Sequence, residues 1–157
     1  GYPAEQVRAQ VGQALELFGL SAFAQANPRD LGYSGRKRIA LASTVAMQTP
    51  VLVFDEPTAG LDANEQEQLS QVIFLLSQQG KTILVISHDM DFLAENFDRF
   101  VLLRAGQVVL DANLQQFFSQ TEALEVCGLV APQMVRLSQA LGRESLAATV
   151  EQFIEKK

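Results

Sequence analysis

The chain has 157 residues, of which 48% are hydrophobic and 19% charged, a composition that supports a packed core and excludes a disordered or low-complexity protein. Twelve Lys and Arg against eighteen Asp and Glu give a net charge of −6, which argues against a surface that coats nucleic acid. The single cysteine, Cys127, excludes an intramolecular disulfide. The apolar runs are too short to span a membrane, and the sequence does not start like a signal peptide. These features predict a soluble intracellular domain.

Short apolar runs alternate with amphipathic segments along the chain, which predicts an α/β fold with a parallel sheet. The run Val51–Phe54 has no polar position and predicts a strand buried on both faces. An Ala-Gly turn predicts a hairpin at the sheet edge. In chain order we expect helices over Ala4–Phe23 and Arg36–Met47, a strand over Val51–Phe54, a helix over Asn64–Gln79, a strand over Thr82–Ile86, a helix over Met90–Asn96, hairpin strands over Phe100–Arg104 and Gln107–Leu110, and helices from Leu114 with a break near Gly128–Pro132.

The most informative stretch is Val51-Leu-Val-Phe-Asp-Glu-Pro-Thr58, in which two acidic residues end a predicted strand. Open α/β sheets bind ligands at the carboxyl ends of their strands. There Asp55 is placed to orient a hydrated Mg²⁺ beside nucleotide phosphates, and Glu56 to polarise an attacking water. Taken without its context, the pair is better explained as a charged strand end followed by a turn.

The context resembles the ATP-binding subunits of ABC transporters, whose core is a P-loop NTPase (RecA-like) sheet. Val51–Glu56 is similar to the Walker B motif, and the following Pro-Thr-Ala-Gly-Leu-Asp62 to the D-loop. Ser87-His88-Asp89 is similar to the histidine switch, and Arg38-Ile-Ala-Leu-Ala42 to the helix after the signature sequence. The order of these blocks is that of the family. The resemblance implies an ATPase that uses ATP and Mg²⁺.

The resemblance also implies roles for individual residues. Asp55 would hold Mg²⁺ through water, Glu56 would be the general base, and His88 would reach the γ-phosphate. Asp62 would couple the two nucleotide sites across a dimer. An imidazole at the end of a buried strand agrees with such a role for His88, since a neutral ring can bond a phosphate oxygen or the attacking water.

The signature sequence departs from the family pattern of Leu-Ser-Gly-Gly-Gln. This chain has Leu31-Gly-Tyr-Ser-Gly35, so that Ser34 and Gly35 match the motif only with a one-residue deletion. We expect both to precede the helix, where a capping hydroxyl and free N–H groups would face a phosphate. An ordinary helix cap explains them equally well, and the motif is degenerate. The basic run Arg36-Lys37-Arg38 is interpreted as a solvated helix start.

The P-loop pattern Gly-x-x-x-x-Gly-Lys-Ser/Thr does not occur in the 157 residues. Gly80-Lys81-Thr82 fails it, because Leu75 stands where the first glycine belongs and the triplet enters a strand. The sequence therefore resembles the C-terminal part of such a subunit. As it stands, we expect it to have no ATPase activity.

The tail Gly128-Leu-Val-Ala-Pro-Gln133 resembles that of energy-coupling-factor ATPases, the cobalt and vitamin importers. We divide the chain into a helical subdomain with the degenerate signature (1–50), the Walker B, D-loop and His-switch half of the ATPase core (51–113), and a C-terminal helical region (114–157). Cys127 is interpreted as a small buried apolar residue.

By this resemblance the complete protein would hydrolyse Mg-ATP to power import of a metal ion or vitamin. Its partners would be transmembrane subunits and a second ATP-binding subunit, identical or not, on the inner face of the cell membrane, with no nucleic acid. One alternative is a non-catalytic interaction module derived from an ABC ATPase. A second is a soluble ABC ATPase of DNA repair or translation. Without the P-loop half the sheet would expose an apolar edge, which predicts self-association.

Overall fold

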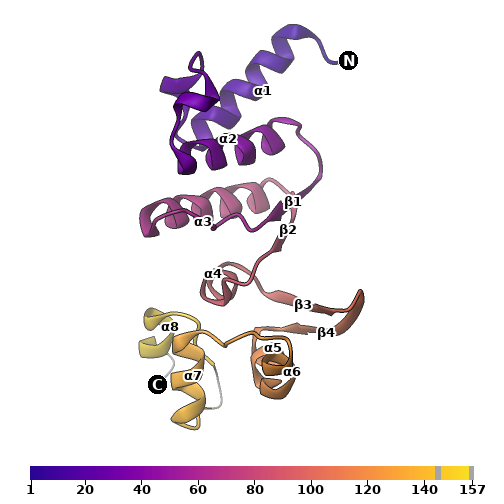
Figure 1. Ribbon diagram of the computed structural model, residues 1–157, viewed down its shortest axis with the longest axis vertical. Coiled ribbons are helices and arrows are strands. Elements are labelled where there is room, and N and C mark those ends of the chain that lie inside the picture. Colours follow the sequence, from indigo (N-terminus) through magenta and orange to yellow (C-terminus); the bar gives the residue numbers. More distant parts are fainter. Residues whose placement is uncertain (144–145, 156–157) are drawn as a thin grey trace. The chain divides into compact units, whose positions relative to one another are not determined.

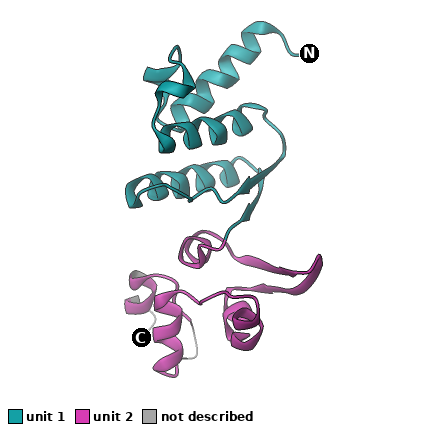
Figure 2. Cartoon of the chain, viewed as in Figure 1, with its two compact units in different colours: residues 1–87 teal, residues 88–157 magenta. Residues whose placement is uncertain are grey.

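The computed structural model describes residues 1–143 and 146–155. The chain forms two compact units, residues 1–87 and residues 88–157 (Figure 2). The fold is α/β, as the sequence predicts, and the parallel strands lie in the first unit.

The first unit is mostly helical and contains one pair of strands (Figure 1). Its elements are α1 (Ala4–Leu17), η1 (Ser21–Phe23), η2 (Pro28–Asp30), α2 (Tyr33–Ala46), β1 (Val51–Asp55), α3 (Ala63–Gln78) and β2 (Thr82–Ile86). The first predicted helix is too long, because Gly19, at φ 65°, ends α1. The N–H of Gly19 bonds the Glu16 carbonyl at 3.0 Å, and that of Leu20 bonds the Leu15 carbonyl at 2.7 Å, which closes the last turn.

Strands β1 and β2 pair in parallel, in a register that runs from Val51 opposite Thr82 to Asp55 opposite Ile86. Leu52 is buried at 1% exposure, while Val53 is 50% exposed. The prediction that the first strand is buried on both faces is therefore wrong, because only its inner face finds helices to pack against among the described residues.

The second unit begins with α4 at its predicted bounds and continues with a hairpin and short helices. Its elements are α4 (Met90–Asn96), β3 (Arg99–Arg104), β4 (Gln107–Asn113), α5 (Leu114–Ser119), α6 (Thr121–Val126), α7 (Gln133–Ala140) and α8 (Val150–Glu155). Ala105 and Gly106 both have positive φ, 48° and 77°, as a tight hairpin turn between twisted strands requires. The hairpin is a sheet of its own and not an edge of the β1–β2 sheet, so that part of the prediction is wrong.

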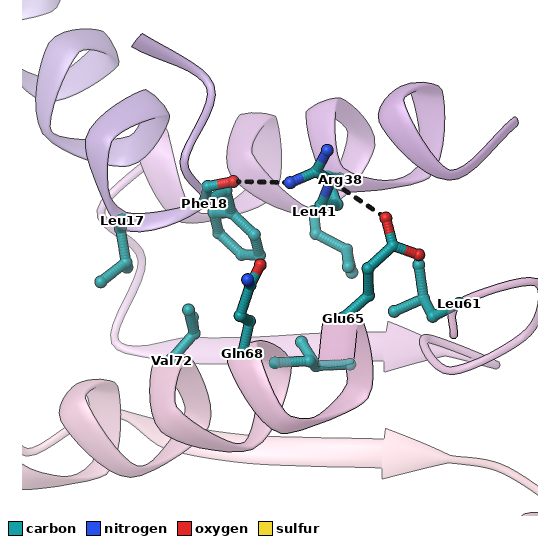
Figure 3. Close-up of a pocket in the computed structure, with 9 residues that line it drawn as sticks. Leu17, Phe18, Arg38, Leu41, Leu61, Glu65, Gln68 and Val72 are labelled. Atoms are coloured by element: carbon teal, nitrogen blue, oxygen red, sulfur yellow. Dashed lines mark hydrogen bonds and ion pairs between the residues drawn. The ribbon is translucent and has the colours of Figure 1, made fainter. Parts of the chain in front are cut away.

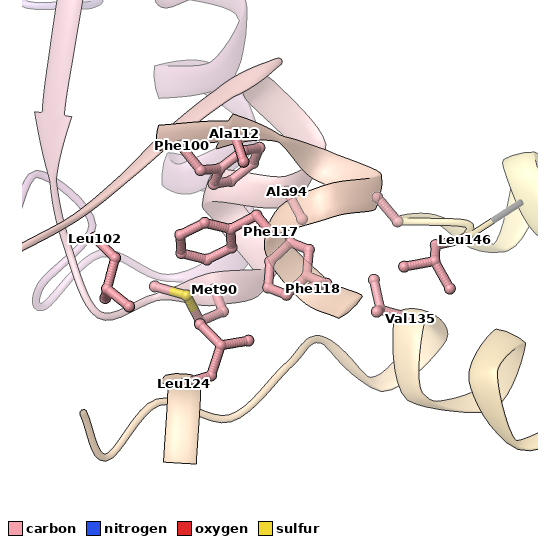
Figure 4. Packing of buried hydrophobic residues seen from close by; sticks show 11 residues of the cluster. Met90, Ala94, Phe100, Leu102, Ala112, Phe117, Phe118, Leu124, Val135 and Leu146 are labelled. Atoms are coloured by element: carbon pink, nitrogen blue, oxygen red, sulfur yellow. The ribbon is translucent and has the colours of Figure 1, made fainter. Parts of the chain in front are cut away.

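A cluster of aromatic rings forms the centre of the second unit (Figure 4). The ring centroids of Phe100 and Phe117 lie 5.0 Å apart, and those of Phe117 and Phe118 lie 5.2 Å apart in an edge-to-face arrangement. Cys127 is partly buried against this cluster, less deeply than predicted. The helices covering one face of the hairpin thus give the unit its own core.

Candidate functional site: the acidic end of strand β1

The predicted acidic pair lies at the carboxyl end of β1. Asp55 is the last residue of the strand and is exposed, and Glu56 follows it and is partly buried. The N–H of Glu56 donates to the Ile86 carbonyl at 2.7 Å, so the strand pairing continues one step beyond β1. The strand pairing therefore fixes the backbone positions from which both carboxylate side chains extend.

Glu56 has an unusual backbone conformation. Its φ is 45°, in the left-handed region that side chains other than glycine rarely adopt, and it precedes Pro57, a position that favours extended backbone. Such a conformation costs about 1–3 kcal/mol and persists where surrounding contacts fix it.

Those contacts come from two other elements of the first unit. The Lys37 ammonium on α2 donates to the Glu56 carbonyl oxygen at 2.6 Å. The Ser87 hydroxyl, directly after β2, donates to the Glu56 carboxylate at 3.0 Å. Together with the bond to Ile86, these contacts hold Glu56 at its N–H, its carbonyl and its side chain.

The loop after Glu56 packs against the start of α2. Gly60 has φ 78°, and a Cβ placed on it would lie 2.2 Å from the Tyr33 ring. Only glycine satisfies both the backbone conformation and the close approach of the ring. Pro57 and Thr58 are buried, so the loop is a fixed part of the unit.

Asp62, predicted to couple two nucleotide sites, is exposed and caps helix α3. Its carboxylate accepts the Glu65 N–H at 2.8 Å, and the Glu65 carboxylate accepts the Asp62 N–H at 3.1 Å, which completes a capping box. The same Glu65 carboxylate accepts a hydrogen bond from the Ser34 hydroxyl on α2. Glu65 thus joins the predicted D-loop to the degenerate signature.

The sequence predicts that Ser34 and Gly35 precede a helix. In the structure they lie within the first turn of α2. The helix begins at Tyr33, with Gly32 at its N-cap and no capping side chain. The Ser34 hydroxyl is engaged with Glu65, and a Cβ on Gly35 would lie 3.0 Å from that of Leu31. The expected serine cap is therefore wrong, while the predicted phosphate contacts of both residues remain a proposal.

Arg38 bridges α1, α2 and α3 at the rim of a small pocket (Figure 3). Its Nη1 lies 3.4 Å from the Phe18 carbonyl, its Nε lies 3.8 Å from the Glu65 carboxylate, and its side chain is only 24% exposed. The interpretation of the basic run as solvated is correct for Arg36, which is exposed, and wrong for Lys37 and Arg38.

His88 is exposed, follows β2 by two residues and begins the second unit. Asp89 accepts the Phe92 N–H at 3.1 Å and caps α4, so the residue after His88 anchors that helix.

The residues present fit a magnesium ion bound mainly by phosphates and water. Among residues 1–143 and 146–155, no hydrogen bond or ion pair engages the Asp55 carboxylate, and no group of three or more potential ligands is found. Mg²⁺ in nucleotide sites is commonly bound through one or two carboxylates, with phosphates and waters completing its coordination. A single available carboxylate at a strand end meets that requirement.

Lys37, Glu65 and Ser87 are the residues of this site to which the sequence analysis gives no role. Glu65 had a signal, since Asp-x-x-Glu before an apolar run is a capping-box pattern. Ser87 belongs to the Ser87-His88-Asp89 motif, but nothing in the sequence indicates that its hydroxyl bonds Glu56. Lys37 carries no local signal, because its partner lies 19 residues away along the chain.

Comparison with known proteins identifies the class of the fold. The solved structure of cbiO1 from Clostridium perfringens, described as part of the ABC transporter complex cbiONQ, aligns with a TM-score of 0.66 and 26% identity over 90% of this chain and 56% of that one. The fold is thus that of part of an ATP-binding cassette. No protein-family model matches the chain.

Curated relatives of the chain are ATP-binding proteins of transporters. The energy-coupling factor transporter ATP-binding protein EcfA2 of Clostridium perfringens is 34% identical over 98% of the chain and 55% of its own length. The cobalt import ATP-binding protein CbiO of Salmonella paratyphi A is 34% identical over 90% of the chain and 52% of its own length. The chain is a homologue of the ATP-binding proteins of ABC transporters, of the energy-coupling-factor and cobalt-import type, and spans about half the length of these relatives.

Proposed function

We propose that these residues carry the catalytic carboxylate of an ABC-type ATPase that, in complete form, binds and hydrolyses Mg-ATP to power transport. The observation that carries the proposal is the Asp55–Glu56 pair at the end of a parallel strand, with Glu56 held at its N–H, carbonyl and carboxylate. Residues 1–50 would act as the helical subdomain, 51–113 as the Walker B half of the core and 114–157 as a helical appendage.

In the mechanism, Glu56 accepts the proton of the water that attacks the γ-phosphate, and the Ser87 hydroxyl orients its carboxylate. Asp55 would hold Mg²⁺ through water, and the ion would neutralise charge on the phosphates. His88 donates to a γ-phosphate oxygen. The P-loop that would cradle the phosphates does not occur among the 157 residues, so we expect no hydrolysis by them alone.

The partners follow from the same proposal. Ser34, Gly35 and Asp62 would face the nucleotide of a second ATP-binding subunit, identical or not, and transmembrane subunits would receive the work of hydrolysis. We place the protein on the cytoplasmic face of the cell membrane. Among the described residues, no helix is both long and apolar enough to cross a membrane.

The transported substrate would be a metal ion or a vitamin, and the cobalt import protein among the relatives supports the metal ion. The same relatives favour the ATPase over the non-catalytic interaction module. We infer no nucleic-acid partner, in keeping with the net charge of −6.

The test is ATP hydrolysis by the complete polypeptide that contains these residues. Glu56→Gln removes the base and should lower kcat about 10²–10⁴-fold. Glu67→Gln, the same change at an exposed position on α3, is the matched control and should leave kcat unchanged. Equal turnover by wild type and Glu56→Gln would contradict the proposal.

A further inference from the structure

We propose that Lys37 is a positioning residue for Glu56, and that its hydrogen bond to the Glu56 carbonyl holds the backbone turn from which the Glu56 carboxylate projects. The catalytic meaning of this inference rests on the proposed function. The contact itself does not, since it joins two elements of the first unit.

The backbone turn at Glu56 depends on the hydrogen bonds that the Glu56 carbonyl oxygen accepts. The carbonyl oxygen accepts a bond from Lys37 at 2.6 Å and a longer one from the Ala59 N–H at 3.3 Å. A bond donated by an ammonium group is stronger than one between neutral groups. Of these two bonds, the one from Lys37 is the shorter and carries the charge, so it is the stronger restraint on the peptide that follows Glu56.

The backbone of Glu56 needs such a restraint. At φ 45° and before a proline, the residue would relax toward extended backbone if its carbonyl were released. Relaxation would turn the side chain away from the Ser87 hydroxyl that now bonds its carboxylate at 3.0 Å. Lys37 thus acts on the carboxylate through the backbone, without touching it.

A second lysine in this unit also donates to the carbonyl of a residue with positive φ, which supports such a role for Lys37. Gln48 also has a positive φ, 55°, and the Lys81 ammonium donates to the carbonyls of Gln48 at 3.1 Å and Thr49 at 2.9 Å. Lys81→Met therefore makes the same chemical change as Lys37→Met, away from Glu56, and is a matched control.

The first measurement is amide hydrogen exchange on the 157-residue chain. Lys37→Met should speed exchange of the Glu56 and Ala59 amides about tenfold, as expected from loss of a bond to a charged donor. Lys81→Met should leave both rates within about twofold. Lys37→Gln keeps a shorter, neutral donor, should give an intermediate rate, and serves if the methionine variant does not fold.

Unchanged exchange at Glu56 in both Lys37 variants would overturn the proposal. So would equal acceleration throughout residues 1–87, since Lys37 would then stabilise the whole unit and not this turn.

The second measurement is steady-state hydrolysis by the complete polypeptide. Lys37→Met should lower kcat about tenfold with KM unchanged, because it disturbs the base and not ground-state binding. Lys37→Arg, which retains the charged donor, should recover most of the loss. Wild-type kcat in Lys37→Met would overturn the positioning role and leave the proposed function intact. If wild type itself hydrolyses no ATP, the proposed function fails, and hydrogen exchange still decides whether Lys37 holds Glu56.

Discussion

Each of the two sheets has one buried and one exposed face, but an exposed face is unusual in only one of them. In the β3–β4 hairpin Phe100 is buried at 5% exposure, and Val101, on the other face, is 44% exposed. In the β1–β2 sheet Leu52 is buried, and Val53 and Leu84, opposite one another, are each 50% exposed. One open face is ordinary for an antiparallel hairpin, whereas parallel strands are normally covered on both faces.

The open face of the parallel pair is also the face of the proposed magnesium ligand. Along β1 exposed and buried residues alternate, so Asp55 lies on the same side as Val53. The hairpin, one face of which packs against helices, carries no proposed chemistry, and the sheet with an apolar open face carries the acidic pair. Among the described residues, the sheet face that carries the proposed magnesium ligand is thus left uncovered.

The largest expected effect is on the covered face of the hairpin. Phe118→Ala removes a side chain with 0% exposure from the aromatic cluster and should lower the free energy of unfolding by about 3–5 kcal/mol. Phe74→Ala, the same change at a 62% exposed position on α3, is the control and should cost far less. Urea unfolding measures both, and equal losses would contradict the assignment of the cluster as core.

The next prediction separates the two faces of β1. Leu52→Ala should cost about 2–5 kcal/mol because the side chain is 1% exposed. Val53→Ala, on the next residue and the open face, should stay within about 0.5 kcal/mol. A large loss from Val53→Ala in the 157-residue chain at low concentration would mean that this face is covered in solution, by self-association as the sequence suggests or by another contact.

Strand content and the order of elements could be predicted from the sequence, because apolar runs and glycine positions are local signals. Thr82–Ile86 and Met90–Asn96 have the predicted bounds. The exposure of one face of β1 could not be predicted, because an apolar run has the same sequence pattern whether one face or both faces of the strand are covered. Likewise the position of Asp55 and Glu56 at a strand end could be predicted. The hydrogen bond from Lys37 to Glu56 could not, because it depends on how α2 packs.

A smaller effect tests how tightly α2 packs on the loop after Glu56. Gly60→Ala and Gly80→Ala place a Cβ at nearly the same φ, 78° and 79°, but only the first meets another side chain. Gly60→Ala should therefore cost about 1–3 kcal/mol more than Gly80→Ala in urea unfolding. In a Tyr33→Ala background the difference should vanish, and its persistence would refute the ring contact as the cause.

The smallest effect belongs to the exposed pair Arg99–Asp111 on the hairpin. Hydrogen bonds from the Arg99 guanidinium, at 2.7 and 2.8 Å, hold the pKa of the Asp111 carboxyl below its usual value. A lowered folded-state pKa means that the pair stabilises the fold above the unfolded-state pKa and that this contribution is lost as pH falls through the folded-state pKa. Solvent and salt screen it, because the two side chains are 76% and 44% exposed.

Asp111→Asn should accordingly shift the urea midpoint slightly at neutral pH and not at all in acid or in about 1 M salt. Asp98→Asn, the same charge change on an exposed neighbour, is the control. A shift of equal size at every pH would show that charge pairing is not its origin.

The central claim, that these residues form one part of a nucleotide site, is tested most directly by calorimetric titration with ATP in Mg²⁺. We expect no binding by the 157-residue chain and binding by the complete polypeptide, weakened in Asp55→Ala. Binding by the 157 residues alone that is lost in Asp55→Ala would contradict it, because the acidic end of β1 would then be a complete nucleotide site without a P-loop.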